Sequence, residues 1–176
     1  MPKPSDHIFI VGGAAGLGLA IAQGADALGC KVTITARGAE RAAEVAQSIS
    51  ARATGLHLDL EDSESIRAAL AGGDAIDHLV VTPIHRVTTT IKDFDRVEAA
   101  RLAHIKLVAY AEAVNAALPR LGPTSSIVLF GGLAKANPYP GSTMVSIVNG
   151  GIVGMTRTLA VELAPIRVNG ISPGLV

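Results

Sequence analysis

Short apolar runs alternate with longer segments of helical periodicity along all 176 residues. The runs that favour β-structure are 8–11, 31–35, 54–58, 77–81, 126–130 and 167–171. The segments with helical periodicity are 17–28, 39–50, 63–70, 92–118 and 143–163. Strands that alternate with helices in this way indicate βαβ units with right-handed crossovers. We therefore predict a single α/β domain over residues 1–176, a doubly wound parallel sheet (Rossmann fold) of about six strands with helices on both faces.

Local signals define several helix ends. Asp62 or Ser63 can cap the helix that runs to Leu70, and Pro119 ends the long helical segment 92–118. That segment has a candidate break near Arg101, and its second half is apolar nearly all round. A helix with this pattern lies in a core or is shared with another subunit.

The stretch from residue 8 to residue 22 reads as strand, glycine turn and helix, with the spacing Gly12-xxx-Gly16-x-Gly18. Glycine is required where the backbone has a positive φ or approaches a ligand closely. The amides that begin the helix then face an anion, most simply a pyrophosphate. The spacing differs from the GxGxxG dinucleotide fingerprint, and a tight turn without a ligand is the alternative.

The end of the second predicted strand bears on the choice of cofactor. Dinucleotide folds place an acidic residue there for the adenosine ribose, or an Arg for a 2′-phosphate. This chain has Arg37 and no acid at that point. A guanidinium pairs with phosphate through two parallel hydrogen bonds, so we expect NADP(H) to be preferred over NAD. A solvated surface Arg is the competing interpretation.

Composition excludes several classes of partner. Fifteen basic and fifteen acidic residues balance, which argues against a nucleic acid or an anionic membrane surface. One cysteine cannot form an internal disulfide, and no clustered ligands suggest a metal. The amino-terminal residues lack the apolar core of a signal peptide, and no uninterrupted apolar run approaches a membrane span. We expect a cytoplasmic protein.

These motifs together resemble the short-chain dehydrogenases/reductases. The glycine loop is similar to their TGxxxGxG, with Val11 in the threonine position, and Asp59-Leu60 is similar to their adenine-contacting Asp-Leu. The segments 154–163 and 166–174 resemble the stretch from the catalytic helix to the PG turn. The resemblance covers essentially the whole chain. It implies the Rossmann fold and reversible hydride transfer between NAD(P)H and a carbonyl or alcohol.

The resemblance also implies catalytic positions, and this chain departs from the family at each. Counted without gaps, the Tyr position is Val145, the Lys position is Asn149, the Ser position is Gly132, and the Asn position falls at or near His104. The NNAG motif reads Val81-Thr82-Pro83-Ile84, and no YxxxK exists in the chain. The sequence also stops before the family's usual carboxyl-terminal substrate-loop region.

The expected cofactor contacts follow from the loop and from the resemblance. They are Gly12, Gly13, Gly16, Leu17, Gly18, Arg37, Asp59, Leu60, Thr82, Pro173 and Gly174. The resemblance further implies a homodimer or homotetramer formed through the helices 92–118 and 143–163. Gly150, Gly151 and Gly154 lie inside the second of these, where glycine is tolerated when another backbone packs close.

Other polar residues are candidates to replace the missing proton donor. His104 is the best single one, and the others are His85, Arg86, Lys135, Tyr139, Ser142 and Ser146. Three hypotheses stay open: an atypical NADP-dependent reductase acting on an unknown small molecule, a non-catalytic nucleotide-binding homologue, and a redox-neutral enzyme that reuses the crevice.

Overall fold

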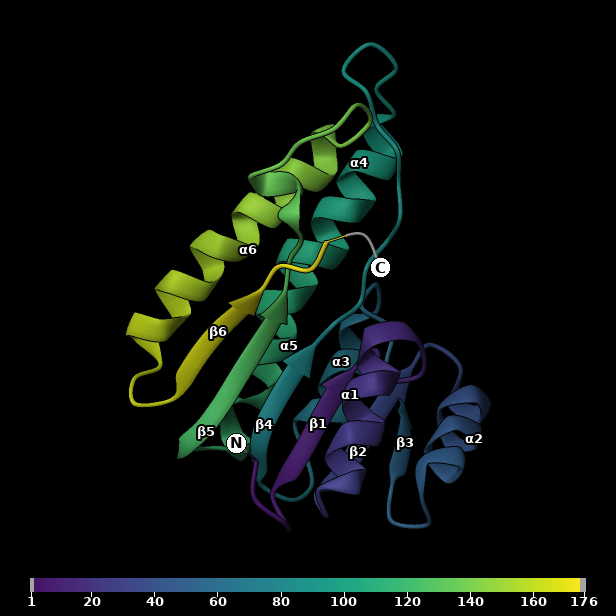
Figure 1. Ribbon diagram of the computed structural model, residues 1–176, viewed down its shortest axis with the longest axis vertical. Helices are drawn as coiled ribbons and strands as arrows, with labels where there is room; N and C mark the ends of the chain where they lie inside the picture. The colour runs from purple at the N-terminus through teal and green to yellow at the C-terminus, as the bar shows by residue number, and fades with distance from the viewer. Residues whose placement is uncertain (1, 175–176) are drawn as a thin grey trace.

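The structure, a computed structural model that describes residues 2–174, contains one six-stranded parallel sheet (Figure 1). The strands are β1 (His7–Val11), β2 (Lys31–Ala36), β3 (Thr54–His57), β4 (Ile76–Val81), β5 (Leu121–Phe130) and β6 (Arg167–Ile171). Their order in the sheet is β3-β2-β1-β4-β5-β6. The chain therefore reverses direction across the sheet between β1 and β4, and the predicted doubly wound fold is confirmed.

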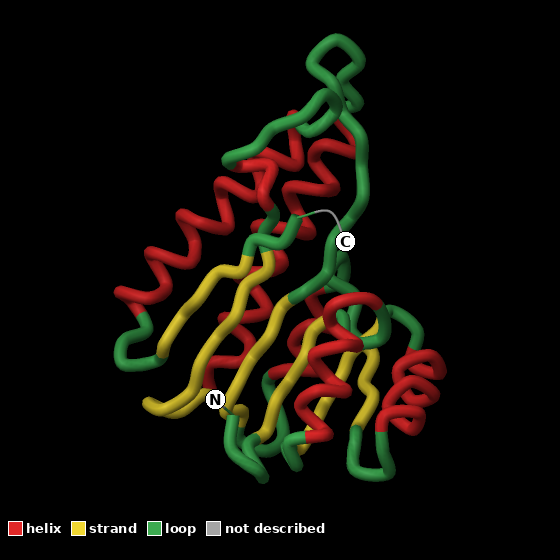
Figure 2. Tube along the Cα trace, viewed as in Figure 1, coloured by secondary structure: helices red, strands yellow, loops and turns green. Residues whose placement is uncertain are grey.

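Helices lie on both faces of this sheet (Figures 1 and 2). They are α1 (Gly16–Ala27), α2 (Ala39–Ile49), α3 (Ser63–Leu70), α4 (Arg96–Ala103), α5 (Ala109–Ala117) and α6 (Thr143–Glu162). Helices α1 and α2 bury alanines and Val45 against one face, whereas α3, α5 and α6 pack on the other around Phe9, Leu79 and Tyr110. Short turns of other helix types are η1 (His104–Val108), η2 (Leu118–Arg120) and η3 (Leu133–Lys135).

Capping side chains fix two helix starts. Asp62 accepts a hydrogen bond from the Glu64 amide at 2.9 Å, so the predicted Asp62 cap is confirmed. The long helix begins at Arg96 rather than at Lys92, because Asp95 accepts from the amides of Val97 and Glu98. The predicted break near Arg101 lies a few residues later, where η1 forms a π-helical segment between α4 and α5.

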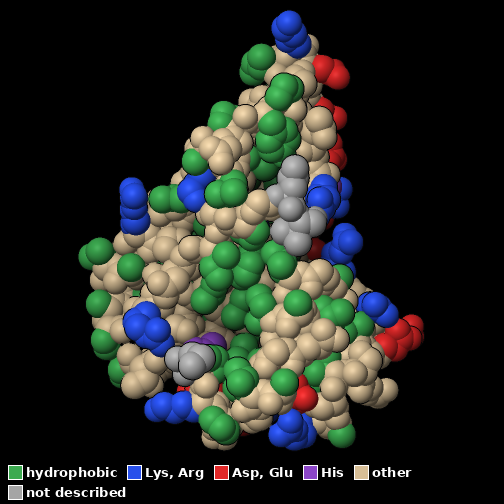
Figure 3. Space-filling view, in the orientation of Figure 1, with side chains coloured by type: hydrophobic (Ala, Val, Ile, Leu, Met, Phe, Trp, Pro, Cys, Tyr) green, Lys and Arg blue, Asp and Glu red, His purple; other side chains and the backbone are tan. Residues whose placement is uncertain are grey.

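The face of the sheet that carries α1 and α2 is open over β5 and β6. Figure 3 shows apolar side chains gathered in the middle of this face. Ile171 of β6 is 45% exposed, and Val128 of β5 is only partly buried. Within residues 2–174 no helix covers this part of the sheet.

Helix α6 is apolar and yet largely exposed. It is the one helix of the described part that is long and apolar enough to cross a membrane by length and composition, and such a single helix is weak evidence of a span. One side packs on β6 and η3 through residues such as Ile152, while Ile147 and Val161 are exposed. A Cβ atom at Gly150 or Gly154 would meet nothing within 4 Å, so among residues 2–174 no neighbouring backbone packs against either glycine.

Close contact between α1 and the end of β1 depends on glycine. A Cβ atom at Gly18 would lie 2.3 Å from the Gly12 carbonyl oxygen and 2.9 Å from the Thr82 hydroxyl. Gly12 itself has a φ of 80°, in the left-handed region that favours glycine. The first turn of α1 can therefore sit directly over the loop that follows β1.

Two substitutions in α1 test this contact. Gly18→Ala should destabilise the fold by about 1–3 kcal/mol, because the added methyl group overlaps backbone. Gly24→Ala is the matched control, since a Cβ atom there meets nothing within 4 Å, and it should stabilise by about 0.5–1 kcal/mol. Urea unfolding measures both, and equal effects of the two substitutions would contradict the account.

Candidate functional site: the crevice at the carboxyl edge

The carboxyl ends of the parallel strands bring the predicted cofactor residues to one edge of the sheet, as expected for ligand sites of this fold. The glycine loop follows β1 and is tied to its neighbour β2. The Gly12 amide donates to the Thr35 hydroxyl at 3.2 Å, and the Gly13 amide donates to the Thr35 carbonyl at 3.1 Å. These two bonds tie the glycine loop to the end of β2.

The start of α1 is open to an anion. Its first-turn amides, from Gly16, Leu17 and Gly18, have no partners within the helix. The N-cap residue is Ala15, whose side chain makes no capping bond, and the first turn contains no acidic residue. A Cβ atom at Gly16 would meet nothing within 4 Å. The positive end of the helix dipole is therefore left for a ligand to satisfy.

Arg37 and Asp59 follow the ends of β2 and β3, on the same side of the crevice. The Arg37 side chain is exposed just beyond β2, and no ion pair holds it among residues 2–174. Asp59 is half-buried, and its carboxylate accepts from the Glu61 amide at 3.0 Å. Leu60 points its side chain into the core, at 5% exposure, so only its backbone faces the edge.

Thr82 and Pro83 join the end of β4 to the glycine loop. The Thr82 hydroxyl lies 2.9 Å from the Val11 carbonyl and 3.1 Å from that of Gly12, and donates to this pair. The Pro83 ring fills the space beside Gly12, 2.7 Å from where a Cβ atom would lie. Farther along the edge, the Pro173 carbonyl accepts from the Leu133 amide at 3.0 Å, and exposed Gly174 follows it.

The positions where the resemblance implies Ser, Tyr and Lys carry Gly132, Val145 and Asn149. Buried Asn149 lies against Gly132, because a Cβ atom at Gly132 would be 2.8 Å from the Asn149 amide nitrogen. Val145 is partly buried in a small apolar cluster with Leu102, Met144 and Val148. None of these three side chains carries a proton that it can give to a substrate oxygen.

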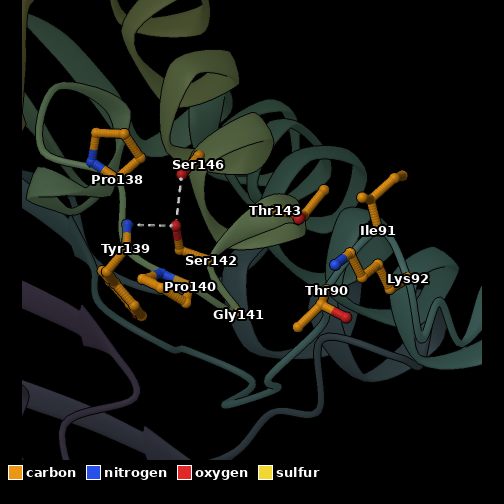
Figure 4. A pocket seen from close by; sticks show the side chains of 10 residues that line it. All are labelled: Thr90, Ile91, Lys92, Pro138, Tyr139, Pro140, Gly141, Ser142, Thr143 and Ser146. Carbon is orange, nitrogen blue, oxygen red and sulfur yellow. Dashed lines mark hydrogen bonds between the residues drawn. The ribbon is translucent and has the colours of Figure 1, made fainter.

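Three of the candidate replacements line a groove of about 530 Å³ at the start of α6 (Figure 4). The Ser142 hydroxyl accepts from the Tyr139 amide at 3.0 Å and lies 3.1 Å from the Ser146 hydroxyl. Ser146 donates to the Ala134 carbonyl at 3.0 Å. Lys135 instead lines a separate pocket of about 160 Å³ and donates to the Ser172 hydroxyl, so the structure does not bring it into this group.

The two histidine candidates lie near α4 and at the start of η1. His85 is 2.6 Å from Glu98, which commits its ring to that carboxylate. His104 is exposed on η1. Its charge, with that of His85, helps to lower the pKa of Glu61, although the largest cause is the hydrogen bond from Arg101. Arg86 is exposed next to His85.

Sequence reasoning missed the most perturbed side chain near the crevice, which is Lys106 in η1. It is 1% exposed, and its amine donates to the Pro83 carbonyl at 3.0 Å and to the Tyr110 hydroxyl at 2.7 Å. Burial lowers the pKa of Lys106 to about 7 and raises that of Tyr110 well above its usual range. A lysine inside an otherwise apolar helix was the signal available in the sequence.

A second polar network lies at the opposite edge of the sheet. His78 of β4 connects the Ser126 hydroxyl, at 2.7 Å, to Asp6, at 3.2 Å. Ser126 is buried in β5 and paired on both sides, with His78 and with Arg167. The backbone amides near Ser126 are paired with β4 and β6, so they are not available to stabilise an oxyanion. The Ser126, His78 and Asp6 side chains instead connect the amino-terminal segment to the sheet.

Comparison with known proteins identifies the class. Residues 6–176 match the family model described as short chain dehydrogenase. A cis-2,3-dihydrobiphenyl-2,3-diol dehydrogenase of Pseudomonas sp. (strain KKS102) is 33% identical over 186 aligned positions, which cover 99% of this chain and 67% of that protein. The chain belongs to the short-chain dehydrogenase/reductase family, an oxidoreductase family that binds nicotinamide nucleotides. It spans about 67% of the length of such relatives.

Solved structures agree with this assignment. A dehydrogenase/reductase from Sinorhizobium meliloti 1021 superposes with a TM-score of 0.88 at 29% identity, over 97% of this chain and 72% of that one. BdcA in complex with NADPH superposes with a TM-score of 0.88 at 25% identity, over 98% and 71% of the two chains. Both likenesses extend over nearly all of the sheet described above.

Proposed function

We propose that this chain binds NADP(H) in the crevice and acts as an oxidoreductase on a carbonyl or alcohol, with a proton donor other than the family's Tyr. The observation that carries the proposal is the start of α1, which presents free amides, an uncapped N-terminus and no acid beside the glycine loop. Membership of an oxidoreductase family supports the reaction type. The substrate is a small molecule whose identity these residues do not define.

The residues of this edge fit a dinucleotide with a 2′-phosphate. Open space at Gly16 and the first-turn amides would receive the pyrophosphate. Arg37 would hold the 2′-phosphate, since no acidic residue competes at the end of β2. Asp59 and the Leu60 backbone would contact the adenine. Thr82, Pro173 and Gly174 border the remaining length of the crevice.

Bound NADPH would supply a hydride to a carbonyl carbon, and the carbonyl oxygen then requires a proton. A substrate carbonyl needs a donor, and the Ser146 hydroxyl, which donates to the Ala134 carbonyl, would have to turn from that bond to orient a carbonyl group in the groove. His104 is the proposed side-chain donor, acting directly or through water. The Asn149 side chain fills the space beside Gly132, so a second polar side chain could not lie there.

A second function is supported by a specific observation. Val145 belongs to an apolar cluster, and Asn149 packs against Gly132. The side chains at the positions of the family's catalytic groups therefore make packing contacts. A non-catalytic homologue that binds the nucleotide and acts through assembly is consistent with this arrangement. The redox-neutral alternative has no comparable support.

We further propose that the protein forms a homodimer or homotetramer through the helices 92–118 and 143–163. Ile147 and Val161 are 56% and 79% exposed on α6, and Val108 of η1 is 57% exposed. Open space at Gly150 and Gly154 would allow another helix to approach closely. The cytoplasmic location, and the absence of nucleic-acid and membrane partners, stay predictions.

Replacing Arg37 tests the cofactor preference. Arg37→Ala should weaken NADPH binding about 10- to 100-fold, because a charged hydrogen-bonding pair is lost, and should change NADH binding little. The control is Arg41→Ala, an exposed arginine one turn along α2 that pairs with Glu44. Fluorescence titration gives the dissociation constants, and equal losses for the two nucleotides would refute the assignment.

Turnover separates the two functions. With a broad panel of ketones and aldehydes, the reductase should oxidise NADPH with at least one compound, and His104→Ala should slow that reaction about 100-fold or more. His57→Ala, an exposed histidine at the end of β3, is the control. Tight NADPH binding without turnover on any compound would favour the non-catalytic function.

The native mass tests the assembly. Sedimentation of the wild type should give a dimer or tetramer, and Ile147→Lys should shift the population toward the monomer by burying a charge at the interface. Leu28→Lys changes a residue of similar exposure, 51%, at the end of α1 and should leave the mass unchanged. A monomeric wild type would contradict the proposal.

A further inference from the structure

Lys106, Tyr110 and the Pro83 carbonyl form a closed triangle of hydrogen bonds behind the crevice. The Tyr110 hydroxyl donates to the Pro83 carbonyl at 2.8 Å and accepts from the Lys106 amine at 2.7 Å. The amine also donates to Pro83, at 3.0 Å, and lies 4.5 Å from the centroid of the Tyr110 ring. These groups are almost inaccessible to solvent, because Lys106 is 1% and Tyr110 0% exposed.

The charge of Lys106 has no counter-ion among the described residues. The elements packed on η1 are α4, α5 and α6. Among the charged groups of α4 and α5, Arg96 is exposed, Glu98 bonds His85, Arg101 bonds Glu61, and Glu112 bonds Arg67. On α6, Arg157 and Glu162 are exposed. Tyr110 is thus the titratable group that faces the amine, and burial alone lowers the pKa of Lys106 to about 7.

One residue, Pro83, separates the Lys106 amine from the glycine loop, which is the proposed phosphate site. Pro83 receives the Lys106 bond through its carbonyl and touches the Gly12 position through its ring. Thr82, the preceding residue, bonds the Val11 and Gly12 carbonyls. An anion on the glycine loop would therefore act on the ammonium group across packed protein, where water screens charge poorly.

We propose that Lys106 is a further determinant of dinucleotide binding, a positioning residue that takes up a proton when the anionic cofactor enters the crevice and attracts it from behind Pro83. This inference rests on the proposed function. Bound phosphates raise the pKa of Lys106, so more of the amine is charged in the complex than in the free protein. Linkage then requires the affinity for the cofactor to fall as the pH rises above about 7.

Calorimetry of NADPH binding at pH 8, in buffers of different ionisation enthalpy, tests the proposal. At this pH the 2′-phosphate, whose second pKa is about 6, contributes little proton exchange. The wild type should take up a measurable fraction of a proton per nucleotide, about 0.15 for a half-unit rise in the pKa of Lys106 from about 7 and more for a larger rise. Lys106→Met, which keeps the length of the side chain, should abolish this uptake and flatten the dependence of affinity on pH.

The control variant is Lys31→Met, which removes a lysine paired with Asp74 at the opposite edge of the sheet and should keep the uptake. Tyr110→Phe keeps the ring and removes one acceptor of the amine, so it should alter the pH midpoint while NADPH still binds. NADPH binding without proton uptake, or uptake that survives in Lys106→Met, would overturn the proposal and leave the proposed function intact. Absence of NADPH binding to the wild type would instead refute the proposed function.

A measurement on the wild type keeps the proposal testable if Lys106→Met does not fold. The ¹³C shift of the Lys106 ε-carbon reports the titration of its amine directly. The midpoint should lie near pH 7 in the free protein and move upward by at least half a unit with saturating NADPH, about a threefold change. An unchanged midpoint would overturn the proposal.

Discussion

The close approach of α1 to the end of β1 is the constraint on which the crevice depends. Without a side chain at Gly18, the first turn of the helix rests on the Gly12 carbonyl, and Thr82 bonds the same backbone from β4. One small region thereby aligns a helix terminus, the loop and the central pair of strands. Because β1 and β4 lie at the switch point of the strand order, the same contact opens the crevice.

The two halves of that crevice differ in how they are built. On the nucleotide side, the helix start is uncapped and Arg37 is exposed, so polar groups are left for a ligand. On the reacting side, Asn149 packs against Gly132 and Val145 joins an apolar cluster. The side chains at these positions therefore pack against their neighbours and offer no group to a substrate. The nucleotide side therefore leaves more polar groups open to a ligand than the reacting side does.

The buried Lys106 changes how charge is distributed between these halves. A lysine without a carboxylate partner costs free energy to bury in its charged form, and the fold accommodates it with a carbonyl and a phenol. An anionic ligand nearby is the partner that such a charge lacks. Under the proposal, occupation of the crevice would favour the charged form of Lys106 without any contact between Lys106 and the ligand.

Hydrophobic periodicity predicted six strands and the fold class, although β5 begins at Leu121, five residues before the predicted run, and β6 has one buried residue. The Asp62 cap was likewise readable, because a capping carboxylate acts on amides two residues away. The helical segment was predicted from residue 92 and α4 begins at Arg96, because the Asp95 carboxylate accepts from the amides of Val97 and Glu98. The burial of Lys106 and the separation of Lys135 from Ser142 depend on tertiary packing, which periodicity does not encode.

The most direct test of the central claim, that the glycine loop and the start of α1 form the dinucleotide site, is the amide spectrum of the ¹⁵N-labelled protein during titration with NADPH. The account predicts that the largest saturable shifts fall on Gly16, Leu17 and Gly18, with smaller ones after β2 at Arg37. Shifts confined to the groove at Ser142 and Ser146, or no saturable shift at the loop, would contradict it.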